Sequence, residues 1–437
     1  MAFKAFLGAT LAFFVTLPAT ALGTELYGPV LGDAEMTSIK IWVQTDIPAT
    51  VEVEYWARDN GPHQKQTLNT RNKHLSGVFE IEGLTPGQTY DYRVSVDEKP
   101  VQRMHPFSFS TLTYWQKRTP PPDFSFALGS CAYMKPEAYG IFESIYRQNP
   151  QMMLWMGDNV YLRPTDLYSE QAMARRYQTP RRTKELQALF ANVPQYAIWD
   201  DHDYGGNDGD RSYRMRENIY NVFKSYWPNP SFGLPGTPGV FTRFEKSDVE
   251  FFLTDNRYHR APNRLKDPAR TFFGEAQWQW LKDSLSSSTS TFKLIVLGNE
   301  TLNTQTPSEN MYSYTGAYRE FLDWLKTSEI PGIVLLSGDR HHTELLKKER
   351  PGSYPLYEWC VSPLTSNAYP PFPVEQDLEI RIPGSLYTKR NFGMVEVTGP
   401  VDNRQLILKR YSATGEENWR YVLKARDLQP TPQKNTK

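Results

Sequence analysis

The chain has 437 residues, of which 39% are hydrophobic and 14% aromatic, and its 49 basic side chains balance 49 acidic ones. This composition excludes disorder for most of the chain and, at about 100–200 residues per domain, allows about two or three domains. A formal charge of zero argues against binding to nucleic acids or anionic membranes, because both need an extended positive field. Any anion that this protein binds must therefore be captured locally.

Residues 1–23 have the pattern of a secretory signal peptide. Lys4 precedes an apolar run, and the small residues at 19–21 predict cleavage near Ala21 or Gly23. A membrane anchor is the alternative, but the run is shorter than the about 20 apolar residues that a spanning helix needs. We therefore expect a periplasmic or secreted protein that has no transmembrane segment after signal cleavage.

The two cysteines, Cys131 and Cys360, are too few for a disulfide scaffold in an exported chain of this length. A single bridge between them is one alternative. Cys360 lies in the apolar run YEWCV, which favours a buried thiol, whereas Cys131 follows the glycine and serine that end a strand-like run. Cys131 is therefore the better candidate for a chemical role.

Short alternating runs between residues 38 and 112 predict an all-β sandwich. These runs are SIKIWVQT, ATVEVEYWA, GVFEIEGL, QTYDYRVSV and HPFSFSTL. The segment LTPGQTYDYRV resembles the turn and strand of fibronectin type III modules, with its tyrosines as core anchors. We expect an Ig/fibronectin III-like domain over residues 24–113, followed by a proline-rich linker at 114–123.

Beyond the linker, apolar strands alternate with helical stretches, which predicts an α/β domain over residues 124–425. The expected helices span residues 136–148, 169–177, 214–227, 275–285 and 317–327. After residue 391 the pattern returns to hairpin-like strands, and residues 426–437 are predicted to form a disordered tail.

Polar side chains follow six strand-like runs of this second domain. The runs end before Cys131, before Asp158 and Tyr161, before residues 200–203, before residues 255–257, before Asn299 and Glu300, and before residues 339–342. Ligands of α/β sheets bind beyond the carboxyl ends of the strands, so the six clusters could converge on one crevice.

Each of these clusters also has an ordinary structural interpretation. A lone aspartate after a strand is usually a turn or capping residue. His202 alone could be a core histidine with satisfied hydrogen bonds, and the pair His341 and His342 could lie on the surface. The run from Asp200 to Asp203 differs, because three carboxylates around one imidazole repel one another unless a cation compensates. We therefore predict a metal centre.

The donor types indicate which metals fit this centre. Carboxylates, an amide such as Asn207, a phenol and few imidazoles favour Ca²⁺, Mn²⁺ or Fe³⁺ over a tetrahedral structural zinc. A thiolate at Cys131 beside a phenolate at Tyr161 would suit a ferric ion, and the oxygen-rich remainder would suit calcium. Paired metals of this kind activate water and polarise a phosphoryl oxygen.

The motifs GSC, GDNVY, WDDHDYGGND, TDNRYHR, GEAQWQWL and SGDRHH resemble, in this order, the alkaline phosphatase D (PhoD-like) family of the calcineurin-like metallophosphoesterases. The resemblance covers nearly the whole chain after the signal. It implies a two-layered β-sandwich catalytic domain flanked by helices and preceded by an Ig-like domain. The superfamily normally has Asp-x-His, Gly-Asn-His-Glu/Asp and Gly-His-x-His; Cys131, residues 201–203 and Asp339-x-His341 stand in their places here.

The resemblance implies the metal ligands one position at a time. Asp158 would bridge the metals, Cys131 and Tyr161 would bind Fe(III), and Asp201 with Asn207 would bind Ca(II). Two further residues are implied in the same region: Asp339 as a ligand, and His341 as either a metal ligand or a phosphate contact.

The resemblance also implies the catalytic residues and the reaction. His202 would contact the phosphate and the leaving group, either stabilising negative charge or donating a proton. Arg257 would clamp the substrate phosphate, with a structural salt bridge as the alternative. The implied reaction is hydrolysis of small phosphate esters by a metal-bridging hydroxide, and the roles of Asp203, Asn299, Glu300 and His342 stay open.

Two alternatives compete with this phosphatase hypothesis. One is phosphodiesterase or phospholipase D-like activity at the same metals, on phosphodiesters or phospholipids, set by pocket walls such as the aromatic-rich residues 225–236. The other is a non-catalytic secreted binding protein with a calcium-stabilised scaffold. The sequence has neither a serine nucleophile elbow nor a P-loop to support another mechanism.

Overall fold

The computed structural model describes residues 24–430, apart from residues 103, 104, 118 and 268. The predicted signal peptide therefore lies outside the described residues. Within the described part, no helix combines the length and apolar character needed to span a membrane.

Residues 26–110 form two antiparallel β-sheets that enclose a core of their own. One has the order β1 (Leu26–Ala34), β2 (Ile39–Thr45), β5 (Ser76–Ile81); the other has β4 (Gln64–Asn69), β3 (Thr50–Ala57), β6 (Thr89–Val96) and β7 (Lys99–Pro100), with β8 (Phe107–Ser110) also paired to β6. Side chains alternate along β6, so the expected anchors Tyr90 and Tyr92 are both buried.

Among the described residues, the larger domain contains two six-stranded sheets. The first sheet has the order β11 (Gln195–Ile198), β10 (Met153–Met156), β9 (Phe124–Gly129), β18 (Asn391–Thr398), β19 (Gln405–Ser412), β20 (Glu417–Lys424). The second has the order β12 (Thr242–Lys246), β13 (Val249–Leu253), β14 (Phe292–Val296), β15 (Ile333–Ser337), β17 (Leu356–Cys360), β16 (Glu344–Lys348). In the first, β9, β10 and β11 are parallel, and in the second β13, β14, β15 and β17 are parallel.

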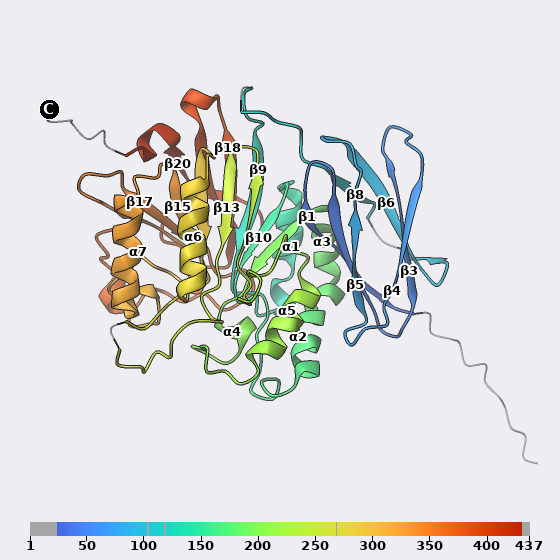
Figure 1. The fold of residues 1–437 in the computed structure, drawn as a ribbon, viewed down its shortest axis with the longest axis horizontal. Helices are drawn as coiled ribbons and strands as arrows, with labels where there is room; N and C mark the ends of the chain where they lie inside the picture. The colour runs from blue at the N-terminus through green and yellow to red at the C-terminus, as the bar shows by residue number, and fades with distance from the viewer. Residues whose placement is uncertain (1–23, 103–104, 118, 268, 431–437) are drawn as a thin grey trace, which may run out of the picture.

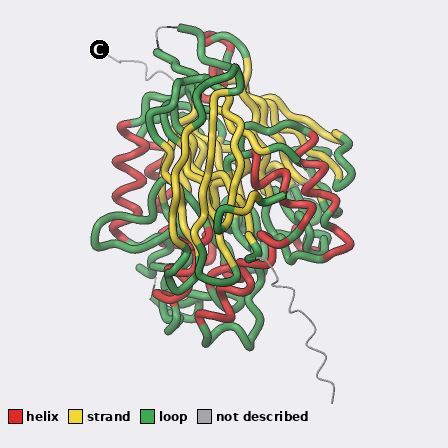
Figure 2. The backbone as a smooth tube through the Cα atoms, turned by 90° about the vertical axis from the view of Figure 1, so that its right-hand side faces the viewer, coloured by secondary structure: helices red, strands yellow, loops and turns green. Residues whose placement is uncertain are grey.

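These two sheets pack face to face, and helices cover their outer faces (Figures 1 and 2). Phe126 of β9 meets Phe251 of β13 edge-on, with ring centroids 5.2 Å apart. The next residue, Phe252, points to the opposite face of the sheet. There it belongs to a second core, between this sheet and the helices α6 and α7. Because successive side chains of a buried strand point to opposite faces, the second sheet packs against the first sheet on one face and against helices on the other. The predicted mixed α/β class is confirmed.

The helices lie in two groups. α6 (Glu275–Ser287) and α7 (Thr315–Thr327) cover the second sheet, whereas α1 (Gly140–Arg147), α2 (Glu170–Arg182), α3 (Gln187–Asn192) and α5 (Arg216–Tyr226) lie on the side of the first sheet and the N-terminal sheets, as Figure 1 shows. Short helices occur at α4 (Asp201–Tyr204), η1 (Pro136–Ala138), η2 (Lys184–Leu186), η3 (Met311–Ser313), η4 (Pro373–Glu375), η5 (Val401–Asn403) and η6 (Ala425–Leu428).

A buried arginine joins the N-terminal sheets to the larger domain. The Arg181 guanidinium of α2 lies 5.6 Å from the ring of Trp42 in β2 and 4.3 Å from that of Trp227. The Trp42 indole N–H also donates to the Ser225 carbonyl at 2.6 Å. Burial lowers the Arg181 pKa to about 10, so this side chain stays charged at neutral pH and is stabilised by the surrounding rings. The proline-rich segment therefore joins two regions that pack directly against each other, with Trp42 of the N-terminal sheets buried in the core of the larger domain.

Two predicted boundaries need correction. The helix expected at 169–177 continues to Arg182, because Ser169 caps its start by accepting the Ala172 N–H and Pro180 is accommodated in its last turns. The tail predicted from residue 426 does not include residues 426–428, since these lie in η6, and Leu428 is buried and accepts the Gly332 N–H through its carbonyl at 2.9 Å. Residues 431–437 lie outside the described part.

Candidate active site

The carboxyl ends of the parallel strands in both large sheets open into one cleft of about 910 Å³. Most of the predicted site residues line it, namely Asp158, Tyr161, Asp201, His202, Asn207, Asp339 and His341. Cys131 follows β9 and is fully buried. Four strand endings, those of β9, β10, β11 and β15, therefore supply the candidate ligands.

Tight turns after the strands aim these side chains. Cys131, Asp158, Asp339 and His341 have φ values of 58°, 54°, 72° and 55°. A left-handed backbone conformation is unfavourable by about 1–2 kcal/mol for a residue that has a Cβ. Residues strained in this way are concentrated at functional sites. Gly157 allows the loops to approach closely, because a Cβ there would lie 2.6 Å from the Asp200 Cβ.

The first group of candidate ligands consists of Cys131, Asp158 and His341, whose donor atoms lie within 4.8 Å of one another. The Cys131 Sγ is 3.9 Å from Asp158 Oδ2. Burial, followed by the charges of Asp158 and Asp339, raises the pKa of the Cys131 thiol well above its usual range. Both cysteines are free thiols in the structure, so the alternative of a bridge between them is not realised.

The hydrogen bonds of His341 define its tautomer. Its Nδ1 lies 2.5 Å from the Asn367 carbonyl, which can only accept, so Nδ1 carries the proton. The neutral ring then presents the lone pair of Nε2, 3.2 Å from the Tyr161 hydroxyl. This is the arrangement of a metal-binding imidazole whose other nitrogen is held by a backbone carbonyl.

The second group, Asp158, Asp201 and His202, is built on the start of α4. Asp200 and Asp203 form a capping box around this short helix. The His202 backbone N–H donates to Asp158 Oδ1 at 3.2 Å and to Asp201 Oδ1 at 2.9 Å, which holds the two carboxylates side by side. The sequence pattern predicted these donors but not the helix.

The third group comprises Asp201, Asp208 and Glu309. The Asp208 N–H donates to Asp201 Oδ2 at 2.8 Å, and the neighbouring Asn207 lines the cleft. Asp208 and Glu309 were not predicted. Asp208 lies in the same motif as Asn207, whereas Glu309 comes from an irregular loop that carries no sequence signal of this kind.

The donor set fits hard cations. Burial and then the charge of Asp201 raise the Asp158 pKa well above its usual range, and burial with Asp200 and Asp201 does the same for Asp339. Such repulsion among buried carboxylates favours a cation of high charge. Carboxylates joined by a thiol, a phenol and an imidazole are therefore consistent with oxygen-preferring metals.

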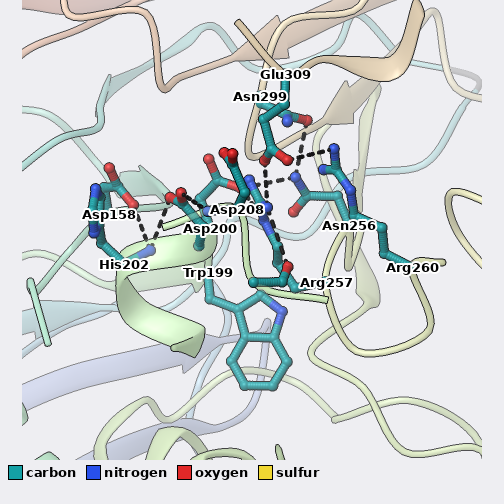
Figure 3. A network of polar contacts seen from close by, with 12 residues as sticks. Asp158, Trp199, Asp200, His202, Asp208, Asn256, Arg257, Arg260, Asn299 and Glu309 are labelled. Atoms are coloured by element: carbon teal, nitrogen blue, oxygen red, sulfur yellow. Dashed lines mark hydrogen bonds and ion pairs between the residues drawn. The ribbon is translucent and has the colours of Figure 1, made fainter. Parts of the chain in front are cut away.

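Arg257 does not line the cleft, so its predicted role as a phosphate clamp needs correction. The residue is fully buried; its Nη2 lies 2.6 Å from Asp200 Oδ1, its Nε donates to the same oxygen, and its Nη1 pairs with Glu309 (Figure 3). The structural salt bridge that was the alternative is what the structure contains. Arg257 neutralises two carboxylates behind the candidate metal site.

The ends of β13 and β14 form a layer of hydrogen bonds beneath the cleft. Asn256 Nδ2 donates to Asp200 Oδ1 at 2.9 Å and to Asn299 Oδ1 at 3.0 Å, and the Trp199 indole donates to Asp255 at 2.8 Å. Four of the six strand endings therefore converge on the cleft as expected. The other two, those of β13 and β14, lie beneath the cleft and hold Asp200 in position.

Three residues without an assigned role also have a place in the structure. Asp203 is buried and accepts the N–H groups of Asn159 and Val160 at 2.9 and 3.2 Å, which fixes the loop that carries Asp158 and Tyr161. Glu300 lies 3.5 Å from the Arg340 guanidinium, and His342 Nε2 lies 3.6 Å from Glu344. These residues support the loops that carry the candidate ligands.

Two cations that the sequence did not single out line the cleft. Lys135 donates to Asn367 Oδ1 at 2.6 Å and has two further N–H donors for a phosphate. Arg340 is almost fully buried and is held by Glu375 at 2.5 Å and Thr306 at 2.8 Å. Lys135 lies four residues after Cys131, and Arg340 directly follows Asp339. Their closeness in sequence to predicted ligands is the signal that could have identified them.

The Arg257→Met variant should lose about 3–5 kcal/mol of unfolding free energy, because Asp200 and Glu309 become buried carboxylates without their partner. Urea denaturation measures this loss. Arg147→Met is the matched control: its exposed ion pair with Glu143 contributes less than about 1 kcal/mol. Unchanged stability with weakened phosphate binding would restore the clamp hypothesis.

The fold resembles that of phosphatases of known structure, and three groups of candidate metal ligands lie around its cleft. Residues 126–400 match the family described as PhoD-like phosphatase, and because this is more than half of the chain, the protein belongs to that family. Residues 24–113 match a domain of unknown function (DUF7800).

A curated relative agrees with this family. Alkaline phosphatase D of Bacillus subtilis (strain 168) is 23% identical over 312 residues, which are 60% of this chain and 52% of that protein. The chain therefore matches about half the length of this curated relative.

Solved structures show the same fold. A structure of PhoD has a TM-score of 0.74 and 17% identity, with 90% of this chain and 88% of that chain covered. A purple acid phosphatase from yellow lupin (Lupinus luteus) seeds has a TM-score of 0.65 and 11% identity, with 92% and 75% covered.

Proposed function

We propose that this protein is a metal-dependent phosphohydrolase of the alkaline phosphatase D type, which releases phosphate from small phosphate esters. The observation that carries the proposal is the convergence of three ligand groups in one cleft, linked through Asp158 and Asp201. A cleft lined by carboxylates would repel a phosphate ester by itself, so cations are needed for substrate binding.

The proposed metal set is Fe(III) and Ca(II). Cys131, Asp158, Tyr161 and His341 would hold the iron, and Asp201 and Asn207 would hold calcium, with Asp208 and Glu309 as further candidates and Asp339 beside both sites. When bound, such cations supply Lewis acidity toward the phosphoryl oxygens and make the attacking water more acidic.

Side chains of the protein would bind the phosphate and protonate the leaving group. Lys135 and Arg340 line the cleft and offer N–H donors to phosphoryl oxygens. The His202 ring stacks on Tyr161, with centroids 4.4 Å apart, and is partly exposed to the cleft. We assign to it the proton that the departing alkoxide requires.

The experiment is hydrolysis of p-nitrophenyl phosphate and of bis(p-nitrophenyl) phosphate by the metal-replete protein, with bound metals assayed. Turnover that EDTA abolishes and added calcium restores supports the proposal. The monoester-to-diester ratio decides between phosphatase and phosphodiesterase activity. Chelation that lowers stability, in a protein that hydrolyses neither ester, would favour the non-catalytic binding protein.

The Cys131→Ser variant should lose most of its iron while keeping its calcium, because a serine hydroxyl is a much poorer ligand for a ferric ion than a thiolate. Elemental analysis of purified protein measures both metals. Cys360→Ser is the control, since that thiol belongs to none of the three ligand groups and donates to the Gly338 carbonyl at 3.1 Å. Equal iron in both variants would remove Cys131 from the ligand set.

Two finer assignments belong to the same proposal. Export to the periplasm or beyond is supported by the pattern of residues 1–23. The Ig/fibronectin III-like assignment of residues 24–113 is supported by their two antiparallel sheets.

A further inference from the structure

Three large aromatic side chains stand exposed on the rim of the cleft. Tyr133 is 43% exposed, Tyr369 53% and Phe372 43%, and all three line the cleft that contains the candidate ligands. We call them the aromatic rim. The aromatic-rich residues 225–236, which the sequence suggested as a pocket wall, do not line this cleft, and Tyr226 and Trp227 are buried in the core.

Each ring of the rim is supported from the side of the site. The ring of Tyr133 lies 4.9 Å from that of Tyr161, and the ring of Tyr369 stacks on His341 at 5.2 Å. The Arg340 guanidinium lies 5.9 Å from the centre of the Phe372 ring. The rim is therefore adjacent to the groups that would hold the phosphate.

Backbone hydrogen bonds hold the rim in place. The Tyr369 N–H donates to the His341 carbonyl at 2.9 Å, which ties the loop after β17 to the candidate ligand loop. The Phe372 N–H donates to Glu375 Oε2 at 2.7 Å at the start of η4. A ligand that stacks on these rings does not have to order them first, which lowers the entropic cost of binding.

We propose that the aromatic rim binds the leaving group of the substrate, and that the natural substrates are phosphate esters whose alcohol carries a planar aromatic ring. This inference rests on the proposed function, because it assigns the leaving-group side of the same cleft. Exposed aromatic rings lose their hydration when a flat ring stacks on them, and this contact favours π-faces over saturated chains. Nucleosides and simple aryl alcohols share that chemistry.

The test uses two pairs of substrates in which the same bond breaks. Adenosine 5′-monophosphate and methyl β-ribofuranoside 5-phosphate both react with water to give a primary alcohol and phosphate, and they differ only in the base. Benzyl phosphate and cyclohexylmethyl phosphate form the second pair, an aromatic against a saturated ring. Because the leaving alkoxides are similar within each pair, the ratio of kcat/KM reports on ring binding.

We expect the aromatic member of at least one pair to have about tenfold higher kcat/KM, the scale of a base stacked on an aromatic side chain. A larger ratio for the first pair would indicate that the leaving alcohol is a nucleoside. A larger ratio for the second pair would indicate a simple aryl alcohol. In the Tyr369→Ala/Phe372→Ala variant the ratio should fall toward one. Tyr168→Ala, which removes a ring 62% exposed outside the cleft, should keep the ratio.

Ratios near one in the unmodified protein, or unchanged ratios in the double variant, would overturn the inference. So would a preference for n-octyl phosphate over benzyl phosphate, since the rim would then bind a flexible chain. If none of these esters is hydrolysed, the proposed function fails, and calorimetric binding of the first pair to the metal-replete protein still tests the rim. Equal affinities for both members would count against it, and tighter binding of the nucleotide would support it.

Discussion

The Asp158→Asn variant should lose about 10³-fold in kcat/KM and most of its bound metal. Asp158, like Asp201, belongs to two of the three ligand groups, so its carboxylate is positioned to contact two cations. An amide carries no charge, and several kcal/mol of charge stabilisation correspond to about three orders of magnitude in rate. Steady-state kinetics and metal analysis of the same preparation measure both losses.

The metal-free variant separates loss of a ligand from loss of the fold. Removing a buried carboxylate that repels Asp201 should leave the unfolding temperature of metal-free protein unchanged or raise it. Asp323→Asn, on the exposed side of α7, is the control and should alter neither metal content nor rate. Full activity with full metal occupancy in Asp158→Asn would rule out the bridging role.

The His202→Ala variant should keep its metals and lose about 10²-fold or more in kcat. The His202 peptide N–H, which orients Asp158 and Asp201, is retained in this variant, so only the ring contacts are removed. A proton donor matters most for poor leaving groups. The loss should therefore be larger for an alkyl phosphate than for p-nitrophenyl phosphate, which departs as a stable anion.

This difference between leaving groups distinguishes proton donation from metal binding by the ring. His63→Ala is a suitable control, because that imidazole is half exposed in the N-terminal sheets and pairs with Glu54. If His202→Ala lost a metal, or lost equal activity on both substrates, His202 would be a ligand or a general contact and its role as a proton donor would be wrong.

Particular residues show how far sequence reasoning extends. Buried strands followed by Asp158, Asp201 and Asp339 identified side chains that line one cleft, since parallel strands carry their carboxyl ends to the same edge. Cys131, also found in this way, is fully buried beside Asp158. The same rule placed Arg257 at the cleft incorrectly. The position after a strand does not tell whether a side chain faces the cleft or the layer beneath it, where Asp200 and Glu309 surround the guanidinium.

The sequence by itself determined the mixed α/β class and the kinds of donor atom in the candidate site, because apolar periodicity and residue chemistry are local properties. Only the tertiary structure decided which endings face the cleft and which support it. It also brought Glu309, Lys135, Tyr369 and Phe372 to the site from irregular loops. The conformation of such loops depends on packing against distant segments, as in the bond from Tyr369 to His341, and no local pattern encodes those contacts.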